Sequence, residues 1–429
     1  MKKTFMPQFE NIDQLFDHQL KGLQWTIEHA YNGSSFYKKH FDEAGVTPGT
    51  VKSLDDLSRL PFTTGNDLKE GYPLPLLSVP EKDVVRIHAS SGTTGKRKVL
   101  SYTQKDLDDW FDMFARCYEM AGLTKEDRVQ IAVGYGVWTA GMGFQLGCER
   151  LGAMAIPVGP GNIDMQCQFL VDLQSTVFCC TASMALLMAE EVNSRGIKDQ
   201  INLKKIILGS ERCSSAMRTK IKELMGLEDM FDITGMTELY GPGTGLDCPE
   251  HEGIHYWADK YILEILNPDT LEPVEDGEIG EMVVTTLCKE AAPLVRYRTR
   301  DLTRKISNLC SCGNILPMHD KIMGRSDDMI ILRGVNIYPG QIDEVLSSIA
   351  EVGSEYQLHL ESKGDGKDYM TIKTEAQQGF DVNNTSEIKN KIKKTVKAKI
   401  MVSCDAQICA YGELPRFAGK AQRIFDNRT

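Results

Sequence analysis

The spacing of apolar side chains along the chain predicts alternating helices and buried strands. Within residues 23–31 and 107–118 the apolar positions recur at helical spacing, which is typical of one face of an amphipathic helix. Continuous apolar runs at 206–208 and 282–284 instead indicate short strands that are covered on both faces. This alternation indicates an α/β fold in which helices and sheets form layers.

The apolar pattern restarts after residue 327. A predicted helix opens at Pro339 and continues to residue 349, with its apolar positions on one stripe. The polar stretch 362–367 indicates a hairpin turn between two strands. We therefore expect two domains, a large layered α/β N-terminal domain at residues 1–326 and a small α+β C-terminal domain at residues 327–429.

Composition narrows the class of protein. A chain of 429 residues is too long for one compact core, and 41% hydrophobic with 25% charged residues is typical of a soluble globular protein. The net charge of −11 argues against nucleic acid or an anionic membrane as the main partner. Because no apolar run could span a bilayer and the polar N-terminus lacks a signal-peptide core, we expect a cytoplasmic protein with reduced cysteines.

The most informative segment is a Ser/Thr/Gly cluster that directly follows an apolar run at 84–87. It consists of Ser90, Ser91, Gly92, Thr93, Thr94, Gly95 and Lys96. Glycines let the backbone bend around an anion, while hydroxyl and ammonium groups donate hydrogen bonds to phosphates. Only two residues separate the glycines where a Walker A loop has four, so a P-loop NTPase is a poor interpretation. By itself, the cluster is more often an ordinary solvated loop than a phosphate site.

Further polar segments follow in an order that suits nucleotide chemistry. Thr237 and Glu238 come directly after a short apolar strand, where they could contact a phosphate and a divalent cation. Asp301 could accept two hydrogen bonds from a ribose diol, and Lys420 could close over the site. Taken singly, each has an ordinary alternative, because Asp301 could form a surface ion pair, Glu238 could be solvated, and lysines are common near C-termini.

Together, these segments resemble the superfamily of acyl-CoA synthetases, adenylation domains and luciferases, whose first phosphate loop has the same Ser-Gly-Thr-Thr-Gly-Lys core. Within it, the chain is most similar to the phenylacetate-coenzyme A ligase family, from about residue 25 to the end. The resemblance rests on segments 88–96, 135–136, 149–153, 324–339 and 414–420. One departure is Arg97, where the family usually has proline. It loosens the loop and adds a charge but leaves the phosphate-facing residues intact.

The resemblance implies two half-reactions and a mobile C-terminal domain. The substrate carboxylate attacks the α-phosphorus of ATP to give an acyl-adenylate and pyrophosphate, and the coenzyme A thiol then displaces AMP. By resemblance, Thr237 contacts the α-phosphate, Glu238 holds Mg²⁺, and Lys420 bridges the α-phosphate and the substrate carboxylate. Asp301 would bind the ribose hydroxyls, and the loop 90–96 would hold the β- and γ-phosphates.

The same resemblance assigns the rest of the site. The ATP and AMP site would also include Gly209, Ser210 and Glu211 as a base-binding turn, Asp232, Ile233, Thr234, Gly235 and Met236 as the opposite wall, and Arg325. The acyl pocket would include Tyr135, Gly136 and Trp138, although Trp138 could equally pack in the core. Asp327 would be the hinge rather than a plain linker carboxylate, and Arg333 with Gly334 would form a loop on the coenzyme A side.

A second candidate site is suggested by cysteine spacing. Cys310 and Cys312 form a tight pair in a polar loop, and Cys248 with His255 lies upstream. Three thiolates and one imidazole satisfy tetrahedral Zn²⁺ with no open position, so such a site would be structural. His251 competes with His255 as a ligand. Because the gap between Cys310 and Cys312 is one residue shorter than usual, unliganded cysteines remain an alternative.

The sequence therefore predicts an ATP-dependent acid–coenzyme A ligase that acts on phenylacetate or a related arylacetate. ATP and coenzyme A would be substrates, with Mg²⁺ and a structural Zn²⁺ bound, and a homodimer is compatible with the sequence. Transfer to another acceptor, such as a carrier protein or a deazaflavin cofactor, is the nearest rival. A non-catalytic nucleotide-binding regulator is a second, although the complete set of Thr237, Glu238, Asp301 and Lys420 counts against it.

Overall fold

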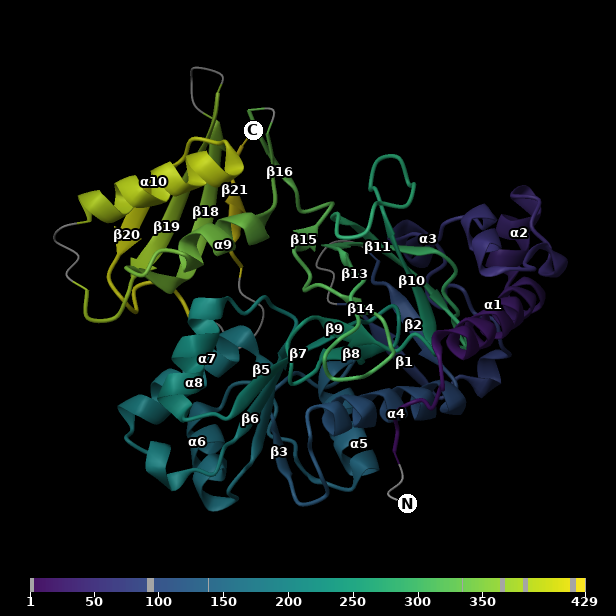
Figure 1. Ribbon diagram of the computed structural model, residues 1–429, viewed down its shortest axis with the longest axis horizontal. Helices are drawn as coiled ribbons and strands as arrows, with labels where there is room; N and C mark the ends of the chain where they lie inside the picture. The colour runs from purple at the N-terminus through teal and green to yellow at the C-terminus, as the bar shows by residue number, and fades with distance from the viewer. Residues whose placement is uncertain are drawn as a thin grey trace.

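The computed structural model describes residues 4–90, 96–137, 139–333, 335–362, 367–380, 385–416 and 422–428 (Figure 1). A large N-terminal part is built on two sheets, and a smaller C-terminal part on one. Helices and sheets alternate in layers, so the α/β fold class expected from the sequence is confirmed. Within the described ranges, no helix is both long and apolar enough to cross a membrane.

The largest sheet has nine strands. In spatial order they are β13 (Lys305–Ile306), β14 (Met318–His319), β9 (Ile254–Tyr256), β8 (Gly241–Asp247), β7 (Asp229–Met236), β6 (Lys205–Gly209), β5 (Val177–Thr181), β3 (Arg128–Ile131) and β4 (Met154–Ile156). From β7 to β4 the strands are parallel, whereas β8, β9, β14 and β13 continue the sheet in antiparallel pairs. The predicted strand at 206–208 is the buried centre of β6.

Helices cover both faces of this sheet. Along β6, Ile206 and Leu208 face one apolar cluster and Ile207 the other, as the two-residue period of a strand requires. One face is covered by α6 (Ile163–Asp172), α7 (Ala182–Ser194) and α8 (Ser215–Met225), and the other by α4 (Gln104–Met120) and α5 (Ala140–Leu151). The predicted helix at 107–118 is the central part of α4, and its apolar side, including Trp110 and Phe114, is buried.

The second sheet is antiparallel and carries the N-terminal helices. Its order is β10 (Tyr261–Leu266), β11 (Gly280–Thr286), β12 (Tyr297–Thr303) and β15 (Gly324–Arg325), so the predicted strand at 282–284 lies in β11. The helix predicted at 23–31 lies within α1 (Ile12–Gly33), which packs against β11 and donates a hydrogen bond from the Thr26 hydroxyl to the Thr286 carbonyl over 2.8 Å.

The other N-terminal elements are α2 (Ser35–Glu43), α3 (Gly65–Glu70), and the hairpin of β1 (Arg86–Ala89) and β2 (Val99–Tyr102). Short 3₁₀ helices lie at Pro48–Thr50, Leu54–Arg59, Glu81–Asp83 and Lys198–Gln200.

The C-terminal part has its own core. The hairpin of β16 (Ile330–Leu332) and β17 (Val335–Ile337) leads into α9 (Pro339–Ser347), the helix that Pro339 was expected to open. The sheet has the order β20 (Asp405–Cys409), β19 (Asp368–Ala376), β18 (Val352–Ser362) and β21 (Ile424–Asp426), and α10 (Ser386–Ile400) packs on it. Strands β18 and β19 are antiparallel and flank the predicted hairpin turn, whose residues 363–366 lie outside the described ranges.

The C-terminal part lies next to α7 and α8 (Figure 1). The Arg212 guanidinium donates to the Gly340 carbonyl over 2.7 Å and lies 3.7 Å from Asp343. Farther along the contact, the Lys220 ammonium donates to the Tyr411 hydroxyl over 2.9 Å. Hydrogen bonds and an ion pair therefore join the two parts in this orientation.

Candidate active site

The β1–β2 hairpin carries the Ser/Thr/Gly cluster that was expected to bind phosphates. Ala89 pairs with Val99, and the Ser90 amide donates to the Lys98 carbonyl over 3.0 Å, so both ends of the loop are fixed. Ser91, Gly92, Thr93, Thr94 and Gly95 lie outside the described ranges. The Lys96 ammonium lies 5.8 Å from the centroid of the Tyr72 ring.

Glu238 lies in the turn that follows β7 and is only 7% exposed. Its Oε1 contacts the ammonium of Lys98 and accepts a hydrogen bond from the Tyr297 hydroxyl over 3.2 Å. The site thus brings the predicted magnesium ligand next to the base of the predicted phosphate loop. The sequence interpretation missed Lys98, whose only signal was a second basic residue two positions after Lys96.

Asp301 and Arg325 meet where β12 pairs with β15. The Arg325 guanidinium donates to Asp301 Oδ1 over 3.0 Å and to both carboxylate oxygens of Asp327 over 2.9 Å. Burial raises the pKa of Asp301 to about 6, and the positive charge of Arg325 acts in the opposite direction. The structure therefore joins the predicted ribose ligand, the predicted nucleotide-site arginine and the predicted hinge residue in one cluster.

A cavity of about 200 Å³ lies between the carboxyl ends of β6 and β7 and the first turns of α5. Carboxyl ends of parallel strands are where open α/β sheets usually bind ligands. The predicted residues that line it are Gly209, Ser210, Ile233, Gly235, Met236 and Thr237. Gly235 is required here, because its φ is +150° and an added Cβ would lie 2.1 Å from the Gly241 carbonyl oxygen.

Three residues predicted for the base-binding turn and its opposite wall, Glu211, Asp232 and Thr234, do not line this cavity. Asp232 and Thr234 alternate with the lining residues along β7, so they face the other side of the sheet. The Asp232 carboxylate instead accepts from Arg218 over 2.5 Å and lies 2.6 Å from the Lys321 ammonium. The Glu211 carboxylate accepts from the backbone amide of Ser183 over 2.9 Å, at the start of α7.

The other residues that line the cavity are mostly apolar, and the sequence interpretation did not predict them. They are Val133, Thr139, Ala140, Phe144, Cys180 and Pro242. Of the predicted acyl-pocket residues, Tyr135 does not line the cavity, because its ring packs against Gly141, where an added Cβ would lie 2.6 Å from a ring carbon. Gly136 has a φ of +92° beside it, and Trp138 lies outside the described ranges.

The predicted residues of the C-terminal part are only partly described. The Arg333 guanidinium donates to the Ser403 carbonyl over 2.5 Å and lies over the Tyr369 ring, so it packs on its own part of the molecule. Gly334 and Lys420 lie outside the described ranges. Their assignments stay predictions.

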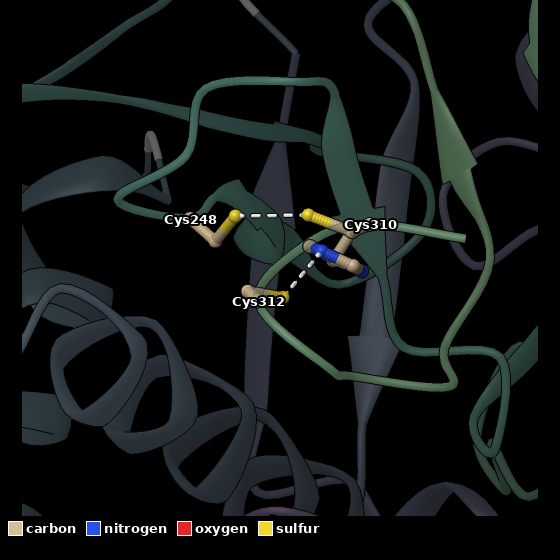
Figure 2. A group of neighbouring side chains, drawn as sticks. Cys248, Cys310 and Cys312 are labelled. Carbon is tan, nitrogen blue, oxygen red and sulfur yellow. Dashed lines mark hydrogen bonds between the residues drawn. The ribbon is translucent and has the colours of Figure 1, made fainter. Parts of the chain in front are cut away.

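The predicted zinc ligands are brought together at the antiparallel end of the nine-stranded sheet. Cys248 follows β8, His255 lies in β9, and Cys310 and Cys312 lie in the loop between β13 and β14 (Figure 2). The Sγ atoms of Cys248 and Cys310 are 3.4 Å apart, and Cys312 Sγ is 3.4 Å from His255 Nε2. All four donor atoms lie within 4.8 Å of one another, and the two separations of 3.4 Å match the roughly 3.3–3.8 Å between ligand atoms of a tetrahedral Zn²⁺ with bonds of about 2.0–2.3 Å.

The surroundings of this cluster suit a metal. His255 Nδ1 lies 2.9 Å from the Leu316 carbonyl oxygen, which orients the ring and leaves Nε2 free to face the thiols. The Asn314 amide donates to Cys312 Sγ over 3.4 Å. Burial raises the pKa of Cys310 to about 12, so an unliganded thiol here is neutral. The competing His251 faces elsewhere, since its two ring nitrogens lie 2.9 Å and 3.0 Å from the carboxylates of Asp247 and Asp229.

Comparison with known family models and solved structures identifies the class of enzyme. The chain matches the AMP-binding enzyme family over residues 34–288 and the AMP-binding enzyme C-terminal domain over residues 334–428. The structure is similar to 2-hydroxyisobutyryl-CoA ligase in its postadenylation state with R3-HIB-AMP, with a TM-score of 0.89, 24% identity, and coverage of 97% of this chain and 90% of that one. Against the same ligase in its thioesterification state, the TM-score is 0.71, with 25% identity and 98% and 91% coverage.

The curated relatives identify the family. Phenylacetate-coenzyme A ligase of Pseudomonas putida is 39% identical over 425 residues, which cover 97% of this chain and 95% of that protein. The enzymes of the same name from Escherichia coli and Thermus thermophilus are 38% and 36% identical, with coverage of 97% and 99% of this chain and of 96% and 99% of those proteins. The chain belongs to the phenylacetate-coenzyme A ligase family, and ATP-dependent acid–coenzyme A ligation is its class of activity.

Proposed function

We propose that this protein activates phenylacetate, or an arylacetate of similar size, with ATP and transfers the acyl group to coenzyme A in the cytoplasm. The observation that carries this proposal is the cavity beside Thr237, whose lining from α5 includes the apolar side chains of Ala140 and Phe144. Its volume of about 200 Å³ lies below the roughly 300–1,000 Å³ of pockets for drug-sized ligands, so it suits a small acid. The names of the curated relatives support the same substrate.

The reaction needs activation because oxide is a poor leaving group. The carboxylate of the acid attacks the α-phosphorus of ATP, the bond to pyrophosphate breaks, and the thiol of coenzyme A then attacks the acyl carbon as AMP leaves. In this scheme Thr237 contacts the α-phosphate, Asp301 accepts from the ribose hydroxyls, and Lys420 lies between the α-phosphate and the acid. Glu238 would hold Mg²⁺, which, when bound, neutralises phosphate charge.

The two half-reactions require different access to the acyl carbon. A lysine that covers the acid during adenylation also blocks the thiol, so we propose that the C-terminal domain, residues 327–429, rotates about Asp327. The ion pair of Arg325 with Asp327 lies at this proposed hinge, and Arg333 with Gly334 would approach coenzyme A after rotation. The greater likeness to the postadenylation state than to the thioesterification state of 2-hydroxyisobutyryl-CoA ligase supports this proposal.

We also propose that Cys248, His255, Cys310 and Cys312 bind one structural Zn²⁺. Four protein ligands leave no open position for substrate, and a buried His255 with a fixed ring suits a permanent ligand. The metal would link the turn after β8 to the loop between β13 and β14. It would therefore stabilise the far edge of the sheet that carries Thr237 rather than take part in catalysis.

The direct test of the proposed function is acid-dependent exchange of labelled pyrophosphate into ATP across a panel of acids. Phenylacetate should support faster exchange than benzoate, acetate or a fatty acid, and added coenzyme A should yield the thioester. Enlarging an apolar wall by Ala140→Phe should abolish exchange with phenylacetate, because the side chain is 3% exposed and lines the cavity. Exchange without thioester would favour another acceptor, and binding of ATP without exchange for any acid would favour a regulator.

A further inference from the structure

The turn that carries Thr237 and Glu238 is held by a buried lysine from a distant part of the chain. Lys289 follows β11 and is 0% exposed. Its ammonium donates to two successive backbone carbonyls of the turn, to Glu238 over 3.1 Å and to Leu239 over 2.7 Å. A single side chain thus bonds the backbone immediately behind the predicted magnesium ligand.

The carbonyls on either side are bonded by a second buried side chain. The Tyr102 hydroxyl lies 2.8 Å from the Tyr240 carbonyl oxygen and 3.3 Å from that of Thr237, and its ring is fully buried. All four carbonyls from Thr237 to Tyr240 are therefore within hydrogen-bond distance of one of these two side chains. Because the Tyr102 hydroxyl has a single proton, three of these carbonyls accept a hydrogen bond at one time, and a turn held in this way has little freedom to change the direction of its side chains.

Burial makes this lysine costly to keep. Removing an ammonium from water costs several kcal/mol unless nearby groups compensate it. Here the ammonium lies 4.7 Å from the Tyr102 ring centroid and 5.1 Å from that of Tyr240, and the carboxylates of Asp106 and Glu238 attract it. Burial lowers the pKa of Lys289, and the two carboxylates oppose that shift. A methionine would fill similar space without this cost.

We propose that Lys289 is a positioning residue of the adenylation reaction, which fixes the backbone of the turn at 237–239 so that the Thr237 hydroxyl and the Glu238 carboxylate face the phosphates. This inference rests on the proposed function. The ammonium group of Lys289 donates hydrogen bonds to two carbonyls of the turn. An apolar side chain in its place would leave both carbonyls without a partner, which explains why a buried lysine is favoured here. Asp106 of α4 holds the residues that follow Lys289 in place, since its carboxylate accepts hydrogen bonds from the Glu290 and Ala291 amides over 2.7 Å and 2.9 Å.

The test compares Lys289→Met with Lys260→Met. Lys260 is a matched control, because its ammonium also forms a largely buried contact, with Asp109 over 2.8 Å, but bonds no carbonyl of the turn. Two readouts are followed in both variants: amide hydrogen exchange of residues 236–241, and the kcat and KM of pyrophosphate exchange. Lys289→Met should speed amide exchange in this peptide and lower kcat about 100-fold, as a misplacement near 1 Å can do, with the KM for the acid within about threefold. Lys260→Met should leave both readouts near the wild-type values.

Other outcomes would overturn the inference. Unchanged amide exchange at 236–241 in Lys289→Met, or equal losses in both variants, would show that Lys289 does not position this turn. If Lys289→Met does not fold, Tyr102→Phe, which removes only the hydroxyl, should produce the same local rise in amide exchange, and its failure to do so would count equally against the inference. Hydrogen exchange does not depend on turnover, so a wild-type protein inactive toward every acid would contradict the proposed function alone.

Discussion

Removing two ligands of the proposed zinc site should lower the melting temperature by an amount that can be worked out from the structure. The perturbation is the double variant Cys310→Ser and Cys312→Ser. These residues supply two of the four donor atoms, and the two that remain, from Cys248 and His255, cannot complete a tetrahedral site. We expect the purified wild-type protein to contain about one Zn²⁺ per chain and the variant to contain none.

The expected loss of stability can be worked from the length of chain that the metal closes. Cys248 and Cys310 are 62 residues apart in the sequence. By the chain-entropy relation for cross-links, closing such a loop in the unfolded state is worth about 4 kcal/mol. At roughly 2.1 cal/mol/K per residue, the unfolding entropy of a chain of this length is about 0.9 kcal/mol/K, so the variant should melt about 5 °C lower.

The assay combines metal analysis with calorimetry. Zinc is measured by mass spectrometry after purification without added metal, and Tm is measured with and without a chelator. Cys404→Ser combined with Cys409→Ser is a matched control, because it also replaces one buried cysteine and one that is not buried, both far along the chain from the cluster. The control should keep its zinc, and the chelator should lower the Tm of the wild type and the control but not that of the Cys310/Cys312 variant.

Two results would refute this reasoning. A wild-type protein that is free of metal yet melts at the same temperature with and without chelator would show that the cluster does not need zinc. A Cys310/Cys312 variant that keeps a full equivalent of zinc would show that the metal lies elsewhere.

Three further predictions concern catalysis. Lys420→Ala should lower the rate of pyrophosphate exchange about 100-fold and spare thioester formation from supplied acyl-adenylate, because the lysine charge is needed only where phosphate charge develops. An unchanged exchange rate would contradict the role proposed for Lys420. Asp327→Pro should retain pyrophosphate exchange and lose most thioester production, because proline fixes φ at the hinge, and equal effects on both half-reactions would exclude a hinge there. The pKa of Asp301 is raised to about 6, so its ionised, hydrogen-bond-accepting form is lost as pH falls through 6. The KM for ATP should then rise about tenfold as the pH falls from 7 to 5. Asp301→Asn should abolish this pH dependence, and a wild-type KM that does not change with pH would contradict the prediction.

Periodicity was sufficient to predict the main elements of the fold. The helix at 107–118 was predictable because its own apolar spacing specifies its buried side, and the strand at 206–208 because its apolar run is continuous. Ile331 shows the limit of the same reasoning, since it lies in an apolar run yet is 53% exposed. A short run does not state whether one or both faces of a strand are covered.

The site was predictable only where chemistry is local in sequence. Thr237 and Glu238 stand together after β7, and the four cysteine and histidine residues of the proposed zinc site stand out by residue type. Lys289 approaches the turn from 50 residues away, and nothing near it in sequence indicates its partner. The apolar lining of the cavity, such as Phe144, is indistinguishable from core until the packing of α5 is known. Strand alternation could have separated Asp232 from Ile233 in advance, because neighbouring residues of a strand face opposite sides.

The central claim is that the acid is activated as an acyl-adenylate. It is tested most directly by a single turnover with phenylacetate labelled with ¹⁸O in both carboxylate oxygens, in the presence of ATP and coenzyme A. Attack of the carboxylate on the α-phosphorus predicts one ¹⁸O atom in AMP and none in pyrophosphate. Label in inorganic phosphate with ADP as the nucleotide product, or AMP without label, would contradict the account.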